Sequence, residues 1–287
     1  MDITEISIAS AKYPEGLRHI AVPPEKLYIR GELRESDANA VAIVGSRRCT
    51  HYGKQVSYDL ANALARRGIT VVSGMALGID AEAHKGALDA GGRTIAVLGT
   101  GVDDASIYPH THKPLAERIV QAGAMLSEFE PGTPAYPGNF PQRNRIISGL
   151  SYGTVIVEAD EKSGSLITAR FALEQGKEVF AVPGQIYSRT TRGVHRLIQE
   201  GAKLITSIED ILEELPQLAA SAVTQQDTTL TEDELRIIEL IAREPAHVDQ
   251  LIEQLALPSH TTIGMLAMLE LKDKIQLIGN NTYAIKE

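Results

Sequence analysis

From residue 41 onward, short apolar runs alternate with amphipathic stretches, three of which end at a glycine: Gly68, Gly91 and Gly176. Most runs are rich in β-branched residues, which is typical of strands buried on both faces of a parallel sheet. A glycine directly after a helix commonly adopts the left-handed conformation that ends it. The apolar runs are 41–44, 69–72, 94–98, 124–126, 154–157 and 178–182, and the helical stretches are about 53–67, 81–90, 113–121, 143–150 and 166–175. This alternation predicts a doubly wound α/β fold with a mostly parallel sheet.

The pattern divides the chain into four parts. Residues 41–215 form the predicted α/β domain, and residues 1–40 are expected to be a lead-in packed on it. Residues 216–230 are small and polar, as in a linker. In 231–287 a capping box opens the first of three predicted helices, and two short strands follow. We therefore expect a small C-terminal winged-helix domain.

The formal net charge of −9 does not exclude a polyanionic ligand, because the acidity is unevenly distributed. Residues 231–287 contain 5 lysines and arginines against 10 aspartates and glutamates, whereas residues 41–215 contain 18 against 19. The single cysteine, Cys49, rules out an internal disulfide. No apolar run has the length of a membrane span and no secretion signal is visible, so a cytoplasmic protein without membrane contact is expected.

The first predicted strand ends in Gly45-Ser46-Arg47-Arg48, just before a helix. Backbone amides at a helix start, the helix dipole and an arginine side chain together make an anion site. The loop lacks both the GxGxxG dinucleotide pattern and the lysine of a P-loop. A surface turn with solvated arginines remains the alternative.

Two further strands end in glycine-containing loops. Ser73 and Gly74 would allow close backbone approach to a phosphate, and Gly99 with Gly101 could form an amide nest. Asp80 is expected to cap the helix that follows its loop. Cys49, His110 and His112 form only a weak metal trio, so no metal and no cofactor are predicted.

Residues 140–165 contain two clusters suited to phosphate, Arg143-Asn144-Arg145 and Ser163-Gly164-Ser165. Arg143 and Arg145 do not share a helical face, so one should face the ligand while the other pairs with an acid, for which Glu158 is the candidate. Phe140 either stacks on a base or closes the core behind the loop. No nucleophile–base pair accompanies these clusters, so no catalytic residue is predicted.

The chain closely resembles the DNA processing protein A (DprA/Smf) family, through motifs that occur in one order. They are GSR at 45–47, SGMALGID at 73–80, AVLGTGVD at 96–103, YP at 108–109, LSEFEPG at 126–132, FPQRNRIISGLS at 140–151, SGSLITA at 163–169 and VFAVPG at 179–184. The resemblance implies an extended Rossmann-like domain that binds single-stranded DNA without hydrolysis. It also implies a homodimer that protects incoming strands during natural transformation and loads the RecA recombinase onto them.

Carried over to this sequence, the resemblance makes Arg47 the principal phosphate contact. The surroundings of Ser73 and Gly74 become a second contact, and the two clusters of residues 143–145 and 163–165 become supporting walls. Two positions depart from the family pattern, with His112 and His195 where asparagine is usual. The family's longer N-terminal helical domain is expected to be missing or reduced.

Two other functions remain open. A nucleotide phosphoribohydrolase would use a PGGxGTxxE motif, but the comparable junction here reads EKSGSLIT at 161–168. A nucleotide-sensing regulator would use its winged helix to read DNA. The helix expected at 259–272 has no lysine or arginine before Lys272, so we expect this domain to contact protein and not DNA.

Overall fold

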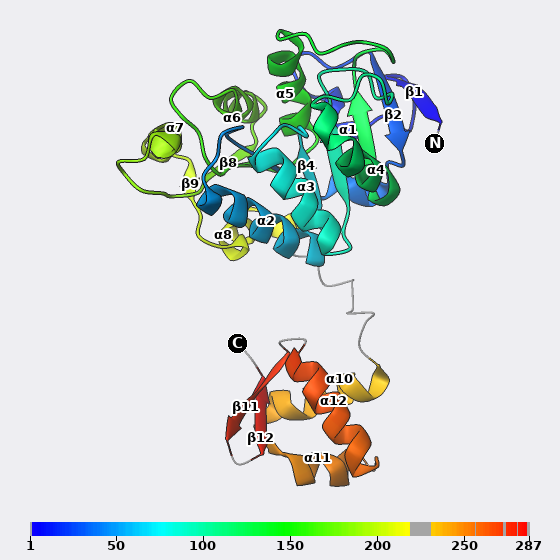
Figure 1. Cartoon of the computed structure of the whole chain (residues 1–287), viewed down its shortest axis with the longest axis vertical. Coiled ribbons are helices and arrows are strands. Elements are labelled where there is room, and N and C mark those ends of the chain that lie inside the picture. Colours follow the sequence, from blue (N-terminus) through cyan, green and yellow to red (C-terminus); the bar gives the residue numbers. More distant parts are fainter. Residues whose placement is uncertain (1, 219–230, 256, 272–273, 280, 286–287) are drawn as a thin grey trace. The chain divides into compact units, whose positions relative to one another are not determined.

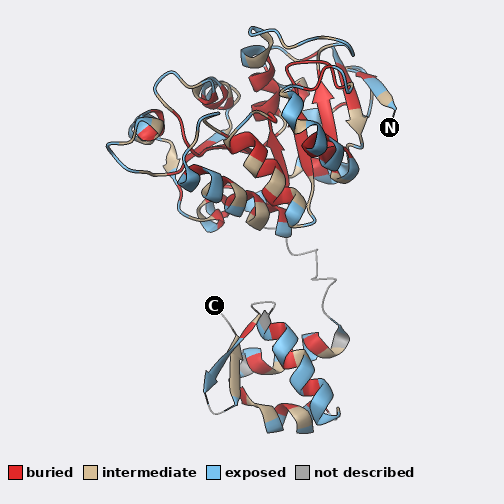
Figure 2. Cartoon of the chain, viewed as in Figure 1, coloured by how far each residue is buried: buried red, intermediate tan, exposed pale blue. Residues whose placement is uncertain are grey.

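The computed structural model describes residues 2–218, 231–255, 257–271, 274–279 and 281–285. The chain divides into two compact units, Met1–Thr224 and Gln225–Glu287. Figure 1 shows the elements of each unit, and Figure 2 shows that the buried residues of the first unit concentrate in its central strands. Within the described residues no helix is long and apolar enough to cross a bilayer.

A single large sheet forms the centre of the first unit. Its described strands follow the order β1-β2-β6-β5-β4-β3-β7-β8-β9. The pairs β1–β2 and β2–β6 are antiparallel, and the remaining neighbours are parallel. The strands are β1 (Ile3–Ser7), β2 (Lys26–Gly31), β3 (Ala40–Val44), β4 (Thr70–Ser73), β5 (Thr94–Val97), β6 (Ala124–Ser127), β7 (Gly153–Ile156), β8 (Glu178–Ala181) and β9 (Lys203–Leu204). The predicted mostly parallel sheet is confirmed.

Helices cover both faces of this sheet. Ala42 and Val44 of β3 belong to a core with one set of helices, and Val41 and Ile43 belong to a core with another, as expected when strand side chains alternate. On the first face lie α1 (Glu15–Arg18), α5 (Asn139–Gly149), α6 (Ser165–Glu174) and α7 (Arg192–Gln199). On the second lie α2 (His51–Arg66), α3 (Ile79–Asp89), α4 (Lys113–Ala122) and α8 (Ile208–Glu214). Three short 3-10 helices complete the unit: η1 (Glu35–Ala38), η2 (His110–His112) and η3 (Arg189–Thr191).

The strand order reverses direction at β3 and β7. From β3 the chain continues to β4 on one side, and from β7 it continues to β8 on the other. The two strands pair in parallel, with Val44 opposite Ile156 at their carboxyl ends. In open α/β sheets, ligands bind outside the carboxyl ends of strands at such a switch point.

The N-terminal residues take part in the first unit. β2 pairs with β6 and β1 pairs with β2, so both extend the sheet. The Tyr13 hydroxyl donates a hydrogen bond to the Pro24 carbonyl oxygen at 2.7 Å. Of the predicted linker, Leu218 is buried in the core of the first unit, and residues 219–230 lie outside the described residues.

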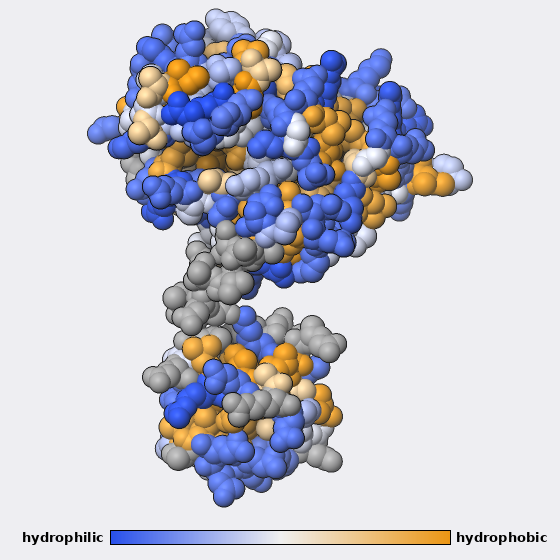
Figure 3. All heavy atoms as spheres, turned by 180° about the vertical axis from the view of Figure 1, so that it is seen from behind, coloured by the Kyte–Doolittle hydropathy of each residue, from blue (hydrophilic) through white to orange (hydrophobic). Residues whose placement is uncertain are grey.

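The second unit has the helices and sheet of a winged helix. Its elements are α10 (Glu232–Arg243), β10 (Ala246–His247), α11 (Val248–Leu255), α12 (Ser259–Leu271), β11 (Ile275–Gly279) and β12 (Thr282–Ile285). Thr231 and Glu234 form the predicted capping box at the start of α10. Ile237, Leu251 and Leu266 contribute one side chain from each helix to its own core. On the face seen in Figure 3, each unit has a mostly hydrophilic surface with separate hydrophobic areas.

Candidate functional site

A cleft of about 840 Å³ opens at the switch point between β3 and β7. Its walls come from the loop after β3, the start of α5 with the loop before it, the start of α6, and η3. The residues that line it include Gly45, Ser46, Arg47, Arg48, Asp80, Tyr108, Phe140, Arg143, Asn144, Asp160, Ser163, Gly164, Ser165, Arg189 and Thr190.

The loop after β3 is fixed by close backbone packing. A Cβ atom on Gly45 would lie 2.6 Å from Cγ1 of Ile79, so the approach of α3 requires glycine there. The Ser46 amide donates to the Glu158 carbonyl oxygen at 2.7 Å. The Glu158 carboxylate accepts hydrogen bonds from the amide and hydroxyl of Thr50, at 2.8 and 2.5 Å, just before α2 begins. The loop after β3 and the residues after β7 are therefore tied together.

Arg47 and Arg48 are exposed at the edge of this cleft. Throughout the described part of the chain, neither forms an ion pair with an acid. The guanidinium carbon of Arg47 lies 5.2 Å from the centroid of the Phe140 ring, within the range of a cation–π contact. Both arginines therefore have charge to offer a ligand.

Phe140 belongs to the cleft wall and also covers the backbone behind it. Its ring is half-buried, and a Cβ atom on Gly99 would lie 2.9 Å from Cδ1 of the ring. Tyr108 lies beside it with the ring centroids 5.8 Å apart. Tyr108 is a cleft residue that sequence reasoning missed, although the Tyr108-Pro109 motif was visible.

Arg143 lies at the floor of the cleft and is 3% exposed. Its Nη1 donates hydrogen bonds to the carbonyl oxygens of Gly74, at 2.8 Å, and of Val97. A Cβ atom on Gly74 would lie 2.6 Å from Nη2, so glycine is needed for this approach. Burial lowers the pKa of Arg143 to about 10, although nearby Asp80 opposes this shift. The guanidinium therefore stays charged at neutral pH, but it already donates hydrogen bonds to backbone oxygens of the protein.

Asp80 does not cap α3 as predicted. The cap position is Gly78, and the Asp80 carboxylate instead accepts a hydrogen bond from the Gly74 amide at 3.1 Å. The pKa of Asp80 is raised because the carboxyl is buried, while Arg143 and backbone amides oppose the shift. Asp80 is the second residue of α3 and not the residue before it, so the prediction was wrong.

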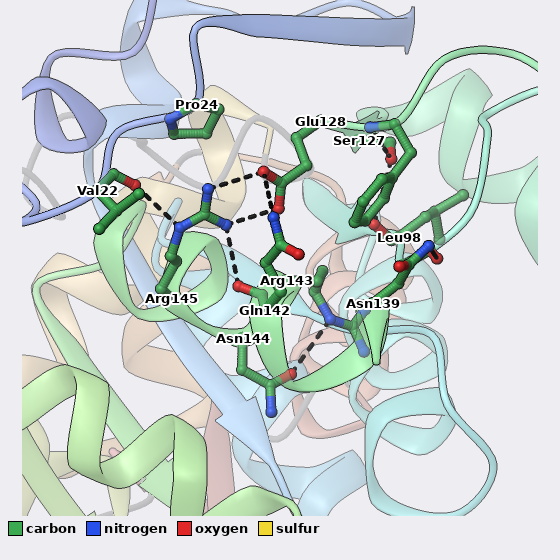
Figure 4. A network of polar contacts seen from close by, with 12 residues as sticks. Val22, Pro24, Leu98, Ser127, Glu128, Asn139, Gln142, Arg143, Asn144 and Arg145 are labelled. Atoms are coloured by element: carbon green, nitrogen blue, oxygen red, sulfur yellow. Dashed lines mark hydrogen bonds and ion pairs between the residues drawn. The ribbon is translucent and has the colours of Figure 1, made fainter. Parts of the chain in front are cut away.

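Arg145 points toward Glu128 and Val22 (Figure 4) and does not line the cleft. Its guanidinium binds the Glu128 carboxylate through two nitrogens, at 2.6 and 2.7 Å, and Nε donates to the Val22 carbonyl oxygen at 2.9 Å. The pairing of one arginine with an acid is confirmed, but the partner is Glu128 and not Glu158. Two helical positions differ by roughly 200° around the axis, which places Arg143 and Arg145 on opposite sides of α5.

The cluster Ser163-Gly164-Ser165 lies on the opposite wall and is joined to α5. The Asn144 side-chain amide donates to the Gly164 carbonyl oxygen at 3.2 Å, and the hydroxyls of Ser163 and Ser165 are 2.7 Å apart. Gly164 provides no side-chain cap for α6, a helix of 10 residues. The Ser165 amide lies 3.4 Å from the Ser163 hydroxyl, and the amides of Leu166 and Ile167 donate to carbonyl oxygens at 3.1 Å. The amino end of α6 therefore offers the cleft its hydroxyl groups and the helix dipole rather than unpaired amides.

Besides Arg145, four predicted contact residues do not line the cleft: Ser73, Gly74, Gly99 and Gly101. The Gly74 backbone is occupied by Arg143 and Asp80. Ser73 is fully buried, and its hydroxyl donates to the Ile43 carbonyl oxygen at 2.6 Å. The Gly101 amide donates to the Thr133 carbonyl oxygen at 2.9 Å, and Gly99 lies behind Phe140. The predicted amide nest is therefore not available to a ligand.

Sequence reasoning also missed the ion pair at the cleft edge between Asp160 and Arg189. Nε of Arg189 lies 2.7 Å from Oδ2 of Asp160, and the Arg189 side chain is 81% exposed. This contact lowers the pKa of Asp160. No local pattern signals it, because the partners are far apart in sequence.

The two unusual histidines bind backbone oxygens. Nδ1 of His112 lies 3.0 Å from the Met75 carbonyl oxygen, and Nε2 of His195 lies 3.1 Å from the Gly184 carbonyl oxygen. Nowhere among the described residues do three or more His, Cys, Asp or Glu side chains meet in a way that could hold a metal ion. The weak trio with Cys49 is therefore not assembled.

Comparison with known proteins agrees with the fold and the motifs. The model of the family described as DNA recombination-mediator protein A matches residues 4–216, and a DprA winged helix domain model matches residues 220–278. DNA processing protein DprA of Bacillus subtilis (strain 168) is 47% identical over 216 residues, covering 75% of this chain and 72% of that protein. Protein Smf of Escherichia coli (strain K12) is 42% identical over 270 residues, covering 90% and 71%.

Two solved structures match about three quarters of the chain. DNA processing protein A from Streptococcus pneumoniae matches with a TM-score of 0.70 and 42% identity, covering 74% of each chain. DNA processing protein A from Helicobacter pylori, described as having a unique single-stranded DNA binding mode, matches with a TM-score of 0.66 and 35% identity, covering 75% of this chain and 96% of that one. The resemblance found in the sequence is confirmed, and the chain belongs to the DNA recombination-mediator protein A family.

Proposed function

We propose that this chain binds single-stranded DNA in the switch-point cleft and does not cleave it. The observation that carries the proposal is the exposed pair Arg47 and Arg48, which has no acid partner among the described residues and lines the same cleft as the amino end of α6. Arginine guanidinium groups and the amino ends of helices both bind phosphate. The Helicobacter pylori relative, described as binding single-stranded DNA, supports this ligand class.

The shape of the site favours an unpaired strand with little sequence preference. Phe140 and Tyr108 provide aromatic surface next to the arginines, and aromatic side chains accept any base as a stacking partner. Proteins that bind single strands with little sequence preference usually combine contacts to phosphates with stacking on bases.

The rival proposal of a nucleotide phosphoribohydrolase needs a free carboxylate in the cleft. Both acids that line the described cleft already have partners. The Asp80 carboxylate accepts a hydrogen bond from the Gly74 amide beside Arg143, and Asp160 forms an ion pair with Arg189. This supports binding without cleavage. Incubation with nucleoside monophosphates should release no free base, and release at a rate that falls when Asp160 is replaced by asparagine would support the enzyme instead.

Fluorescence anisotropy with labelled oligonucleotides tests the proposal directly. A single-stranded oligo-dT should bind more tightly than a duplex of the same length at equal salt, because a rigid duplex cannot bring its bases into the cleft. Equal affinity for both, or no binding, would contradict the proposal. Salt must be held fixed, since affinity for DNA depends steeply on it.

We further propose that the protein acts as a homodimer in the cytoplasm, protects incoming strands and loads the RecA recombinase onto them. The family's description as a recombination mediator supports this role. The test is RecA assembly on a strand coated with single-strand binding protein: the lag before RecA hydrolyses ATP should shorten. An unchanged lag would contradict loading, and light scattering of the eluted protein would measure the oligomeric state.

We also propose that the winged-helix unit contacts protein and not DNA. The described helix α12 contains no lysine or arginine, and Ile263 and Met268 on it are 52% and 50% exposed. Such a helix lacks the charge needed to neutralise phosphates. Replacing both residues by serine should leave oligonucleotide affinity unchanged, and a loss of DNA affinity would contradict this assignment.

A further inference from the structure

The loop between β8 and α7 exposes two apolar side chains at its tip. The Ser188 amide donates to the Gln185 carbonyl oxygen at 3.0 Å, so residues 185–188 form a β-turn with Ile186 and Tyr187 at its centre. Ile186 is 71% exposed and Tyr187 is 92% exposed. An aromatic side chain so fully exposed at a turn has no packing role in the described structure.

The turn is held in place from both sides. The Thr191 hydroxyl donates to the carbonyl oxygens of Gln185 and Ser188, at 2.7 and 3.0 Å. At the base of the loop, Nε2 of His195 lies 3.1 Å from the Gly184 carbonyl oxygen, and a Cβ atom on Gly184 would lie 2.4 Å from Cγ2 of Thr191. The tip is therefore presented in a defined position, which lowers the entropy lost when a ligand binds.

The loop is continuous with the cleft. Arg189 and Thr190, which follow the turn directly, line the cleft. The Cα atoms of residues two positions apart lie at most about 7 Å from each other, so Tyr187 stands just outside the cleft edge. Residues 183–191 contain no acid, and Arg189 is 81% exposed although it contacts Asp160.

We propose that Tyr187 stacks on a base of the nucleotide that follows those held in the cleft. The inference deepens the proposed function and rests on it. Two apolar side chains between Gln185 and Arg189 form too small a patch for a stable protein interface, which buries many residues on each side. One aromatic ring next to a cation suits a single base.

The test compares oligo-dT with an oligonucleotide of the same length whose bases outside a short central stretch are replaced by abasic sites. Tyr187→Ala should weaken binding to oligo-dT about 5- to 100-fold, the range expected when one stacked base is lost. It should leave binding to the mostly abasic oligonucleotide unchanged. Tyr187→Phe, the matched control, should keep the affinity of the unchanged protein for both, because the ring is retained.

An equal loss on both oligonucleotides, or no loss on oligo-dT, would overturn the inference. A change from dimer to monomer in Tyr187→Ala, measured by light scattering, would likewise overturn it and assign the tip to a protein contact. Arg47→Ala separates this outcome from failure of the proposed function, since it should weaken binding to both oligonucleotides. If Arg47→Ala leaves both affinities unchanged, the cleft is not the DNA-binding site. If Arg47→Ala weakens binding but Tyr187→Ala does not, only the role of Tyr187 is wrong.

Discussion

Two pairs of arginines in this protein have opposite roles. Arg47 and Arg48 are exposed at the cleft and lack acid partners among the described residues, whereas Arg143 and Arg145 are buried in α5 and bind carbonyl oxygens or carboxylates. A buried guanidinium must be paired, because an isolated buried charge is very costly. In this chain, the exposed arginines are therefore the ones proposed to bind the ligand, and the buried ones hold the walls of the cleft together.

The largest expected effect concerns Arg145. Arg145→Ala leaves Glu128, whose side chain is 11% exposed, without its partner, and removing one member of a buried pair costs about 3–5 kcal/mol. Urea unfolding should show this loss in the free energy of unfolding. The double variant Arg145→Met with Glu128→Leu should recover most of it, since no buried charge remains. A fully stable Arg145→Ala would break the comparison.

Lowering the pH should reduce the stability of the folded protein through a buried histidine. Burial, together with nearby His112 and Arg143, lowers the pKa of fully buried His84 to about 3, against about 6.5 when unfolded. Below pH 6.5, His84 therefore binds a proton in the unfolded chain but stays neutral in the folded protein. Stability is lost as the pH falls from about 6.5 to 3, by up to about 1.4 kcal/mol per pH unit.

Unfolding of the unchanged protein and of His84→Gln across this range isolates the contribution, and the variant should have the shallower profile. Oligonucleotide affinity of the folded protein should stay flat from pH 6 to 8, since arginines do not titrate there. Parallel unfolding profiles for the two proteins would contradict the assignment of His84.

A smaller effect is expected for Arg47. Arg47→Ala should change the free energy of unfolding by less than about 0.5 kcal/mol, as is usual at exposed positions. Loss of one phosphate contact should reduce the slope of log affinity against log salt by about 0.7 on a single strand. Arg47→Lys should keep most of the slope, because it keeps the charge. An unchanged slope in Arg47→Ala would remove Arg47 from the ligand-holding pair.

The smallest effect belongs to Phe140. Phe140→Leu removes the cation–π contact with Arg47, worth about 0.5–1 kcal/mol at an exposed site, and this loss alone should weaken oligo-dT binding about two- to fivefold, beyond the loss of any base stacked on the ring. A double-mutant cycle with Arg47→Ala should show coupling between the two residues. Additive effects would mean that Phe140 binds DNA independently.

The central strands could be predicted because residues buried on both faces must be apolar along their whole length. The start of α5 could not, since Pro141 and the absence of a capping side chain give no clear signal at Asn139. β1, α7, α8 and β9 were missed because they are short and depend on tertiary packing.

In the site, the glycine loop after β3 and the cluster at the start of α6 were foreseen from local chemistry. The partners of Arg143 and Arg145 were not, because Gly74, Val97 and Glu128 approach them only in the folded chain. Asp160 and Arg189 likewise meet only through the path of the loop after β8.

Glu158 has a consequence for the speed of binding. Its backbone holds the Ser46 loop and its carboxylate holds the residue before α2, so the two sides of the switch point are set before any strand arrives. If these loops do not rearrange when an oligonucleotide binds, association should occur in one kinetic phase. The observed rate should then rise linearly with oligonucleotide concentration. Glu158→Gln, which weakens these charged hydrogen bonds, should make that rate level off as a slow isomerisation becomes limiting.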